Sequence, residues 1–288
     1  QELYEGLIAS GQNAFPNVDF DLGAVNGLLG RFFAAGFYYK TFMGVPPFEW
    51  GKGTKIWMLY EKLIRRAAGM GVASRLPDPD KYEHGNDFCD VIIIGSGPAG
   101  IAAAQEAADK KLDVVLVEQD SLIGGNKLAE NNFDSEKLKL ELIASGVRVM
   151  TRTTAFGLYD NCVVGLLERV TDHMDIKPKY MPRQRFWTIR SKHIILATGA
   201  FERHIAFNNN DLPGVMNANA AQHYLNRYGV LAGENITLAT NNDSVYRTAI
   251  QLSKAGSKVV VVDSRSSIED EINRDLNTNN IELILGRV

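Results

Sequence analysis

The chain has 288 residues, of which 45% are hydrophobic and 23% charged, proportions that are ordinary for a globular protein. Its formal net charge of -3 and the lack of a basic stripe exclude nucleic-acid binding as its main function. The longest aliphatic runs are strand-sized and a bilayer span needs roughly 20 apolar residues, so we predict no membrane-spanning segment.

The segment 1–88 is rich in aromatic residues and glycine but shows no alternation of strand and helix patterns. We expect one amphipathic helix in it, over Met58–Ala68, followed by a polar, proline-containing linker over 74–87. We expect the aromatic residues to pack against a neighbouring domain or subunit.

The segment 89–232 alternates in the manner of an α/β domain, with one clear helix at Pro98–Lys110. Its predicted strands are Asp90–Ile94, Asp113–Glu118, Val147–Met150, Phe156–Tyr159, Val163–Arg169, Phe186–Arg190 and Ile194–Leu196. We expect the strands between residues 156 and 190 to form a meander. We expect Ile194–Leu196 to be a buried strand that ends in a tight Ala-Thr-Gly turn.

The segment 233–288 repeats the pattern with a second βαβ unit. Its predicted elements are strand Ile236–Thr240, helix Ser244–Ala255, strand Lys258–Asp263 and a last strand at Ile281–Leu285. The loop after its first strand is Asn241-Asn242-Asp243-Ser244, whose side chains and negative charge would keep a pyrophosphate away. We therefore predict a degenerate, structural unit, and we expect the chain to be truncated at its C-terminus because a doubly wound sheet would need more strands.

The loop after the first strand of segment 89–232 is Gly95-Ser96-Gly97-Pro98-Ala99-Gly100, a GxGxxG sequence between a strand and a helix. Gly95 allows the sharp turn, Gly97 lets a pyrophosphate approach the backbone, and Gly100 lets the helix pack closely on the strand. Pro98 and Ala99 open the helix, whose free N–H groups and positive dipole end would face the phosphates. This loop predicts a dinucleotide-binding site.

Glu118 closes the second strand at the spacing expected of the acid that binds the adenosine ribose. Its carboxylate can accept hydrogen bonds from both ribose hydroxyls and would repel a 2′-phosphate, which disfavours NADP. We expect Gln119, which follows it, to contact the cofactor as well.

Further cofactor contacts are predicted on three later segments. Gly125, Asn126 and Lys127 would follow the cofactor outward, a backbone N–H and C=O near Ala155 could bracket the adenine edge, and Thr198 and Gly199 would close the site from the last strand. Together these features predict a Rossmann-like, doubly wound domain of the two-dinucleotide-binding flavoprotein type.

Six stretches carry a resemblance that covers nearly the whole chain. They are GFYYKTFM (36–43), YEKLIRRAAGMG (60–71), PDPDKYEH (77–84), ATGAFERHIAFNNNDLPGVM (197–216), LNRYGV (225–230) and TNNDSVYRTA (240–249). With these stretches the chain resembles the alpha subunit of heterotetrameric sarcosine oxidase. His204 stands where that family commonly has proline in ATGAxERP, so this loop departs from the pattern.

The resemblance implies several properties of the protein. The chain would be a fragment, without an N-terminal ferredoxin-like module and a C-terminal folate-binding region, of a subunit that assembles with beta, gamma and delta subunits. The small number of cysteines, two, fits a reducing cytoplasm, so we predict a cytoplasmic location. NAD would be bound non-covalently at the glycine loop, while FAD in the beta subunit oxidises sarcosine to glycine. A covalent FMN at the subunit interface would pass the electrons to oxygen, and tetrahydrofolate would take the one-carbon unit.

Two other interpretations stay open. Related alpha subunits of proline dehydrogenases and hydrogen cyanide synthases bind FAD at the same site, so FAD is the alternative cofactor. The chain could also be a non-catalytic scaffold that keeps the fold for assembly. We predict no catalytic residue and no metal ligand in this chain. Its two cysteines, Cys89 and Cys162, are too few for a disulfide framework and too far apart for a CxxC pair.

Overall fold

A computed structural model describes residues 20–24, 75–130, 133–208, 210, 212 and 214–286. The helix predicted over Met58–Ala68 lies outside these residues. The chain divides into two units, and every strand that is described belongs to the unit made of residues 81–172 and 177–288.

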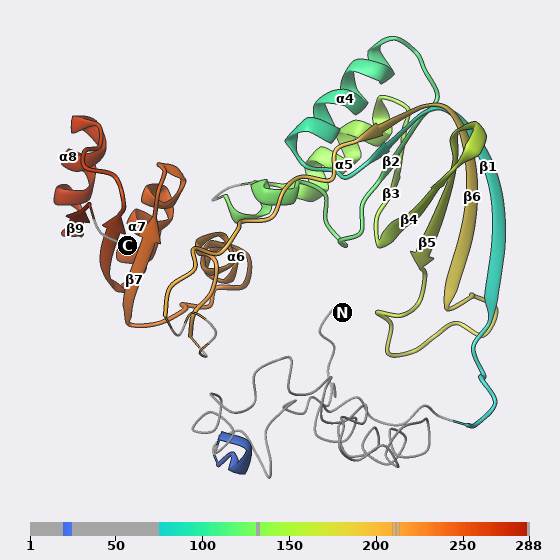
Figure 1. Ribbon diagram of the computed structural model, residues 1–288. Coiled ribbons are helices and arrows are strands. Elements are labelled where there is room, and N and C mark those ends of the chain that lie inside the picture. The colour runs from blue at the N-terminus through green and yellow to red at the C-terminus, as the bar shows by residue number, and fades with distance from the viewer. Residues whose placement is uncertain are drawn as a thin grey trace, which may run out of the picture. The chain divides into compact units, whose positions relative to one another are not determined.

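The described elements follow a strand–helix order through most of this unit (Figure 1). The strands are β1 (Tyr82–Ile94), β2 (Val114–Val117), β3 (Val147–Met150), β4 (Thr153–Tyr159), β5 (Val163–Arg169), β6 (Gln184–Leu196), β7 (Asn235–Thr240), β8 (Lys258–Asp263) and β9 (Glu282–Leu285). The α-helices are α4 (Pro98–Asp109), α5 (Ser135–Ala144), α6 (Ala218–Tyr228), α7 (Ser244–Lys254) and α8 (Asp270–Thr278). Short 3-10 turns are η1 (Leu22–Ala24), η3 (Gly125–Ala129) and η4 (Asp160–Cys162). None of the described helices has the length and apolar composition that crossing a bilayer requires.

The first sheet has the strand order β3-β2-β1-β6-β5-β4. Strands β3, β2, β1 and β6 run parallel, and β5 and β4 add an antiparallel extension, which is the predicted meander. Ile94 at the end of β1 pairs with Val117 of β2 and Leu196 of β6, so three carboxyl ends meet at one edge of the sheet. Ligands of open α/β sheets bind at this edge.

Alternation of side chains along β1 divides the core into two layers. Val91 and Ile93 belong to the cluster under α4 and α5, whereas Ile92 and Ile94 belong to a cluster with β2, β5 and β6. The predicted α/β fold class is confirmed. In the described residues the layer opposite α4 and α5 is built by the curled meander rather than by helices (Figure 1).

The structure corrects two predicted boundaries and one burial. Strand β1 begins at Tyr82, inside the predicted linker, because Tyr82–Cys89 pairs with β6. Strand β6 is one continuous strand, where the sequence predicted two. The strand end expected to be buried is exposed, with Ile195 at 37% and Leu196 at 60%. Paired but half-exposed strands carry polar residues at many positions, so hydrophobic periodicity underestimates them.

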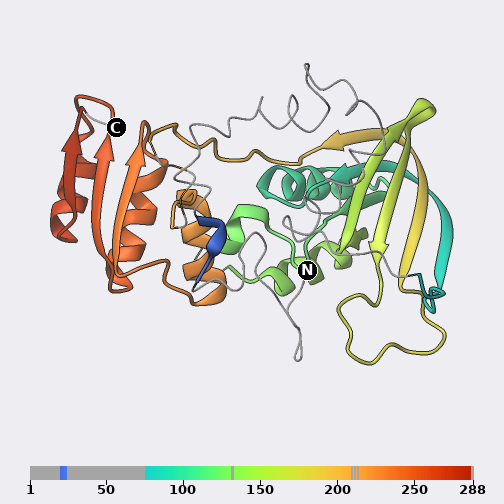
Figure 2. The ribbon, with the colours of Figure 1, turned by 60° about the horizontal axis from the view of Figure 1, so that its bottom comes forward.

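The second sheet is parallel, in the order β7-β8-β9, and confirms the predicted second βαβ unit (Figure 2). Helices α7 and α8 pack on it through a core that includes Val245, Leu252, Val261 and Leu276. Helices α5, α6 and α8 were not predicted. The sequence of α8 is strongly polar, and Leu276 is its sole buried residue.

Candidate dinucleotide-binding site

Two glycines of the Gly95–Gly100 loop are required by the fold itself. Gly95 has φ +100°, donates its N–H to the Val117 carbonyl at 2.8 Å, and a Cβ on it would lie 2.3 Å from the Ala197 carbonyl oxygen. A Cβ on Gly100 would lie 1.9 Å from the Gly95 carbonyl oxygen. Side chains at these positions would separate α4 from the strands β1 and β6.

Gly97 is different because the protein itself does not require a glycine there. Its backbone is extended, with φ -67°, and a Cβ would meet no described atom within 4 Å. The space beside Gly97 is therefore open on the side that a Cβ would occupy. The residues present fit a pyrophosphate, which needs close access to the backbone.

The N-terminus of α4 faces this open space without a neutralising partner of its own. Gly97 caps the helix with no side-chain hydrogen bond, and the first turn contains no acidic residue. Ile101 makes the first helical bond, from its N–H to the Gly97 carbonyl at 3.0 Å. The N–H groups of Ala99 and Gly100 precede it, and such groups with the positive dipole end form an anion-binding site.

Glu118 lies against this loop. Its Oε2 accepts the N–H of Ser96 at 3.0 Å and the Ser96 hydroxyl at 2.5 Å, and its Oε1 accepts the N–H of Asp120 at 2.8 Å. A carboxylate offers about four acceptor sites, so these three donors leave about one, on Oε1, for a ligand. The structure thus gives Glu118 a part in shaping the loop and reduces the expected capacity for two ribose hydroxyls.

A second pair of glycines lies on the loop. Gly124 donates its N–H to the Ser96 carbonyl at 2.9 Å, and a Cβ on Gly125 would lie 3.0 Å from the Cα of Gly97. Both have positive φ, +131° and +55°. Asn126 and Lys127 follow in η3, the first exposed and the second half-buried. The structure therefore brings Gly125 directly to the loop and places Asn126 and Lys127 next along the chain.

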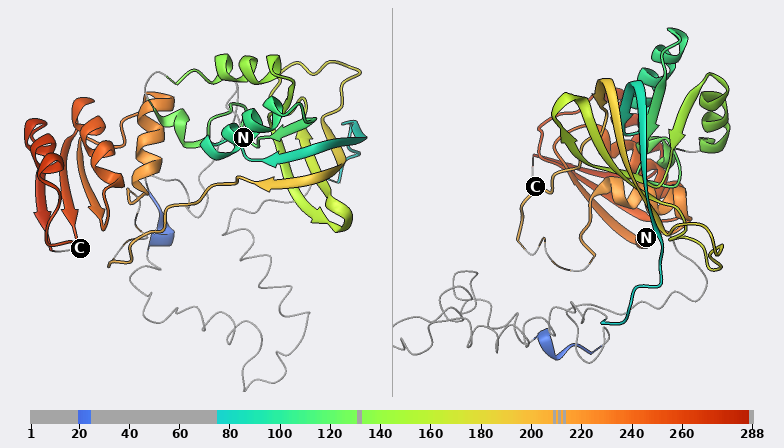
Figure 3. Two further views of the ribbon diagram at one scale, coloured as in Figure 1. Left: turned by 90° about the horizontal axis from the view of Figure 1, so that it is seen from above. Right: turned by 90° about the vertical axis from the view of Figure 1, so that its right-hand side faces the viewer.

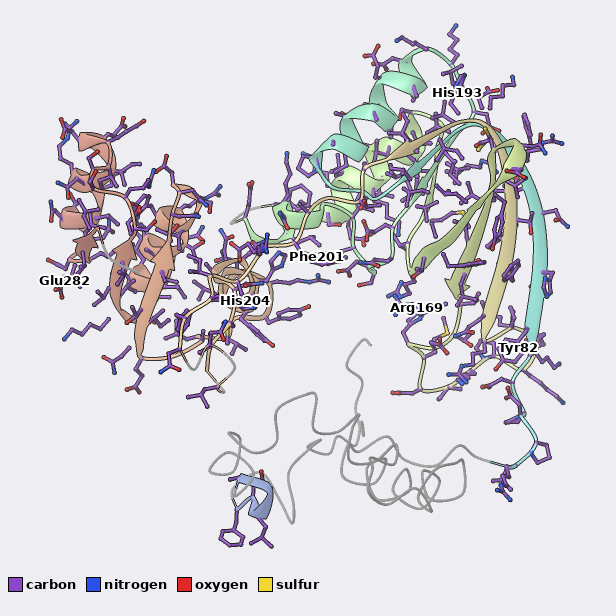
Figure 4. The ribbon with its side chains drawn as sticks, viewed as in Figure 1. Tyr82, Arg169, His193, Phe201, His204 and Glu282 are labelled. Carbon is purple, nitrogen blue, oxygen red and sulfur yellow. The ribbon has the colours of Figure 1, made fainter. Side chains whose placement is uncertain are left out.

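Thr198 and Gly199 follow β6 on the other side of the loop. Ala197 donates its N–H to the Ile94 carbonyl at 2.8 Å, which places this turn beside Gly95. Both Thr198 and Gly199 are exposed, and Gly199 has φ +74°. The chain then continues through Phe201 and His204 to α6 (Figure 4).

Ala155 lies on β4, the edge strand of the sheet. Thr153, two residues earlier, donates its N–H to the Glu118 carbonyl at 2.8 Å instead of to β5. The pairing with β5 shifts register between Ala155 and Gly157, so Ala155 lies beside a β-bulge. Its contact with an adenine edge stays a prediction.

The glycine motif gives no indication of the roles of three residues in this region. Ser96 is fully buried and contacts both Glu118 and Gly124, which explains a small hydroxyl residue at this position. Arg169, at the end of β5, donates from Nη2 to the carbonyl of the exposed Gln119 at 2.5 Å (Figure 4). Asp120 forms an ion pair with Arg227 of α6. Only the tertiary contacts identify these residues.

The corresponding loop of the second βαβ unit is filled by its own side chains. Asp263, the acid at the end of β8, is fully buried and accepts hydrogen bonds from the Tyr246 hydroxyl and from Arg265 Nη2, the latter at 2.7 Å. Arg265 also pairs with Asp243 of the loop at 2.7 Å. Both oxygens of the Asp263 carboxylate therefore accept hydrogen bonds from residues of the second unit itself.

The two cysteines do not form a redox pair. Cys89 is buried in the sheet core, and burial raises the pKa of its thiol to about 12, so the thiolate is absent at neutral pH. Cys162 is exposed at the turn between β4 and β5.

Comparisons with known proteins agree with this geometry. The family model described as pyridine nucleotide-disulphide oxidoreductase matches residues 89–288. The sarcosine oxidase alpha subunit of Rhizobium meliloti (strain 1021) is 46% identical over 92% of this chain and 27% of that protein. That of Corynebacterium sp. (strain U-96) is 39% identical over 70% of this chain and 22% of that protein. Among solved structures, L-proline dehydrogenase from P. horikoshii is 26% identical, with a TM-score of 0.46, over 70% of this chain and 36% of that chain.

The chain thus spans about a quarter of the length of these curated relatives. The resemblance to sarcosine oxidase alpha subunits, predicted from six stretches, is confirmed by the identity of 46%. The family model covers both βαβ units, including the glycine loop and the acid that shapes it. The chain therefore belongs to the pyridine nucleotide-disulphide oxidoreductase family, oxidoreductases that use a flavin or nicotinamide dinucleotide.

Proposed function

We propose that this chain is the dinucleotide-binding part of the alpha subunit of a sarcosine oxidase. The observation that carries the proposal is the 46% identity to a protein of that name over 92% of the chain. The open space at Gly97 and the free N-terminus of α4 support a role in binding the cofactor.

In this proposal NAD occupies the site, and FAD is the alternative occupant. Gly95, Gly97, Ala99 and Gly100 hold the pyrophosphate, and the remaining acceptor site of Glu118 holds the adenosine ribose. Gln119 and Ala155 flank the adenosine, and a last group lines the remainder of the cofactor: Pro98, Gly125, Asn126, Lys127, Thr198 and Gly199. The negative charge of Glu118 would repel a 2′-phosphate, so NADP is disfavoured. When bound, a nicotinamide or flavin ring supplies the hydride chemistry that side chains lack.

The complete protein would act within a complex. Its beta, gamma and delta subunits, an FAD and an FMN outside this chain, and transfer of the one-carbon unit to tetrahydrofolate belong to the same proposal. Sarcosine would be oxidised to glycine outside this chain, with electrons passing to oxygen. A cytoplasmic location stays a prediction.

Identification of the cofactor tests the proposal. The intact complex that contains this chain is purified and denatured, and the released non-covalent nucleotides are separated by chromatography and quantified per subunit. We expect one NAD for each copy of this chain, in addition to any FAD. A second equivalent of FAD without NAD would assign FAD to the Gly95 loop. Release of no nucleotide from this chain would contradict the proposal.

A further inference from the structure

Helix α6 forms an ion pair with the segment that directly follows Glu118. Arg227 of α6 binds Asp120 through two parallel hydrogen bonds, Nη1 to Oδ2 at 2.7 Å and Nη2 to Oδ1 at 2.8 Å. The Arg227 side chain is only 18% exposed. Paired bonds of this kind are short, strong and geometrically specific. They hold the Asp120 carboxylate in one orientation.

The backbone of Asp120 continues this contact to the site. Its N–H donates to Glu118 Oε1 at 2.8 Å, and Oε2 of the same carboxylate accepts from Ser96 in the glycine loop. The Asp120 carbonyl accepts the N–H of Arg152 at 2.8 Å, which fixes the peptide from its other side. A continuous series of hydrogen bonds therefore runs from α6 through Asp120 and Glu118 to the loop.

Charge gives a second reason for the arrangement. Glu118 and Asp120 are two carboxylates separated by one residue, the first buried and the second half-buried. Asp120 has Arg227 as its cationic partner, whereas the donors described for Glu118 are the neutral groups of Ser96 and Asp120. Removal of Arg227 would allow the Asp120 turn to move and would add repulsion at the acceptor site.

Helix α6 packs in the core of the second sheet and also binds Asp120 through Arg227. Ala221 of α6 lies in the core formed with α7 and β8, and α6 lies beside η3 of the first site (Figures 2 and 3). The second βαβ unit, whose own nucleotide loop is filled, can thus support the first unit from outside.

We propose that Arg227 is a positioning residue of the dinucleotide site: it acts through Asp120 to orient the Glu118 carboxylate toward the adenosine ribose. The inference rests on the proposed function, because it requires a dinucleotide at the Gly95 loop. In this inference Arg227 acts through the Asp120 turn, to which it is bound, rather than by contact with the cofactor.

The experiment measures binding of NAD and, separately, of FAD to the full chain by calorimetry, with thermal unfolding of each variant as a check. Arg227→Gln and Asp120→Asn are each expected to weaken binding about three- to thirtyfold. The double variant is expected to bind no more weakly than the poorer single variant, because both changes break one pathway. Arg227→Lys, which keeps the charge but loses the planar fork, is expected to show an intermediate loss.

Two matched controls separate positioning from simple attachment of α6. Asn226→Ala removes the bond from the neighbouring Asn226 Nδ2 to the Ala129 carbonyl, 2.7 Å long, without touching Asp120. Arg247→Gln removes an equal charge from an exposed pair with Glu130. Both are expected to change affinity by less than about twofold.

The outcomes are distinct. An equal loss of affinity in Asn226→Ala and Arg227→Gln would overturn the inference, since attachment of α6 alone would explain both. Unchanged affinity in Asp120→Asn would also overturn it. If Arg227→Gln fails to fold, Arg227→Lys and Asp120→Asn decide the question in the same way. If the unmodified chain binds neither NAD nor FAD, the proposed function itself fails, and the inference with it.

Discussion

The two βαβ units share an order of strand, loop, helix, strand and acid, yet the loops after their first strands differ in what occupies them. In the first, the space beside Gly97 is open, and Glu118 keeps about one acceptor site. In the second, Asp243 and Arg265 fill the loop and Asp263 is fully buried. The same topology thus leaves an open loop in one unit and a filled loop in the other, because loop side chains, not the fold, determine what a loop can hold.

The largest effect is expected from adding a methyl group to a glycine that the first unit requires for folding. In Gly100→Ala the new Cβ would lie 1.9 Å from the Gly95 carbonyl oxygen, so α4 must move away from β1. We expect a loss of about 3 kcal/mol or more in unfolding free energy. Urea unfolding followed by circular dichroism measures it. A variant as stable as the unmodified chain would contradict the close packing of loop and helix.

Gly97→Ala should separate binding from folding. Its Cβ meets no described atom within 4 Å and its φ is ordinary, so stability should remain unchanged. A displaced pyrophosphate loses charge-assisted hydrogen bonds of about 1.5–3 kcal/mol, roughly tenfold to a hundredfold in affinity. Calorimetric titration with NAD and with FAD measures the loss.

Gly233→Ala is the matched control, because a Cβ there has ordinary contacts at 3.7 and 3.8 Å and lies outside the glycine loop. Equal nucleotide affinity in Gly97→Ala and the unmodified chain would show that the open space at Gly97 is not the binding site.

Glu118 and Asp263 can be compared by removing one hydroxyl group that donates a hydrogen bond to each carboxylate. Ser96→Ala removes a donor to Glu118, and Tyr246→Phe removes a donor to Asp263. Each should cost about 1–3 kcal/mol of stability, because a buried acceptor loses a partner. Only Ser96→Ala should also weaken nucleotide binding. Weaker binding in Tyr246→Phe would mean that the second unit contributes directly to the site.

The smallest effects are expected at the extremes of pH, and they differ between the regions. Burial opposes ionisation of Asp120, but Arg227 lowers the pKa of this carboxyl to about 2. The stability that ionised Asp120 provides is fully present above pH 3.8, the ordinary pKa of this carboxyl, and is lost as the pH falls through about 2. Burial and the hydrogen bond to Asp263 raise the pKa of Tyr246 to about 12. The stability that protonated Tyr246 provides is fully present below pH 10, the ordinary pKa of tyrosine, and is lost as the pH rises through about 12.

Unfolding free energies measured across pH test these signs. Asp120→Asn should remove part of the acid-side decline and leave the alkaline side unchanged, and Tyr246→Phe should do the reverse. A decline that stays the same in both variants would assign the pH dependence to other groups.

The sequence alone determined the fold class, the glycine loop and the acid that follows it. These features depend on local order: a buried apolar run, glycines at fixed spacing and an acid at a strand end, all within about 30 residues. The strands Val147–Met150, Val163–Arg169 and Lys258–Asp263 were also predicted with the bounds that the structure has, because each is a short run dominated by valine and leucine.

Only the tertiary structure decided how the site is shaped. The β1 extension from Tyr82 depends on pairing with a strand about 100 residues away, and the exposure of Leu196 depends on what packs against it. The orientation of Glu118 depends on Ser96 and Asp120, and Asp120 in turn depends on Arg227, which is 107 residues distant in the chain. Contacts between distant residues leave no local pattern, since each partner alone is an ordinary polar residue.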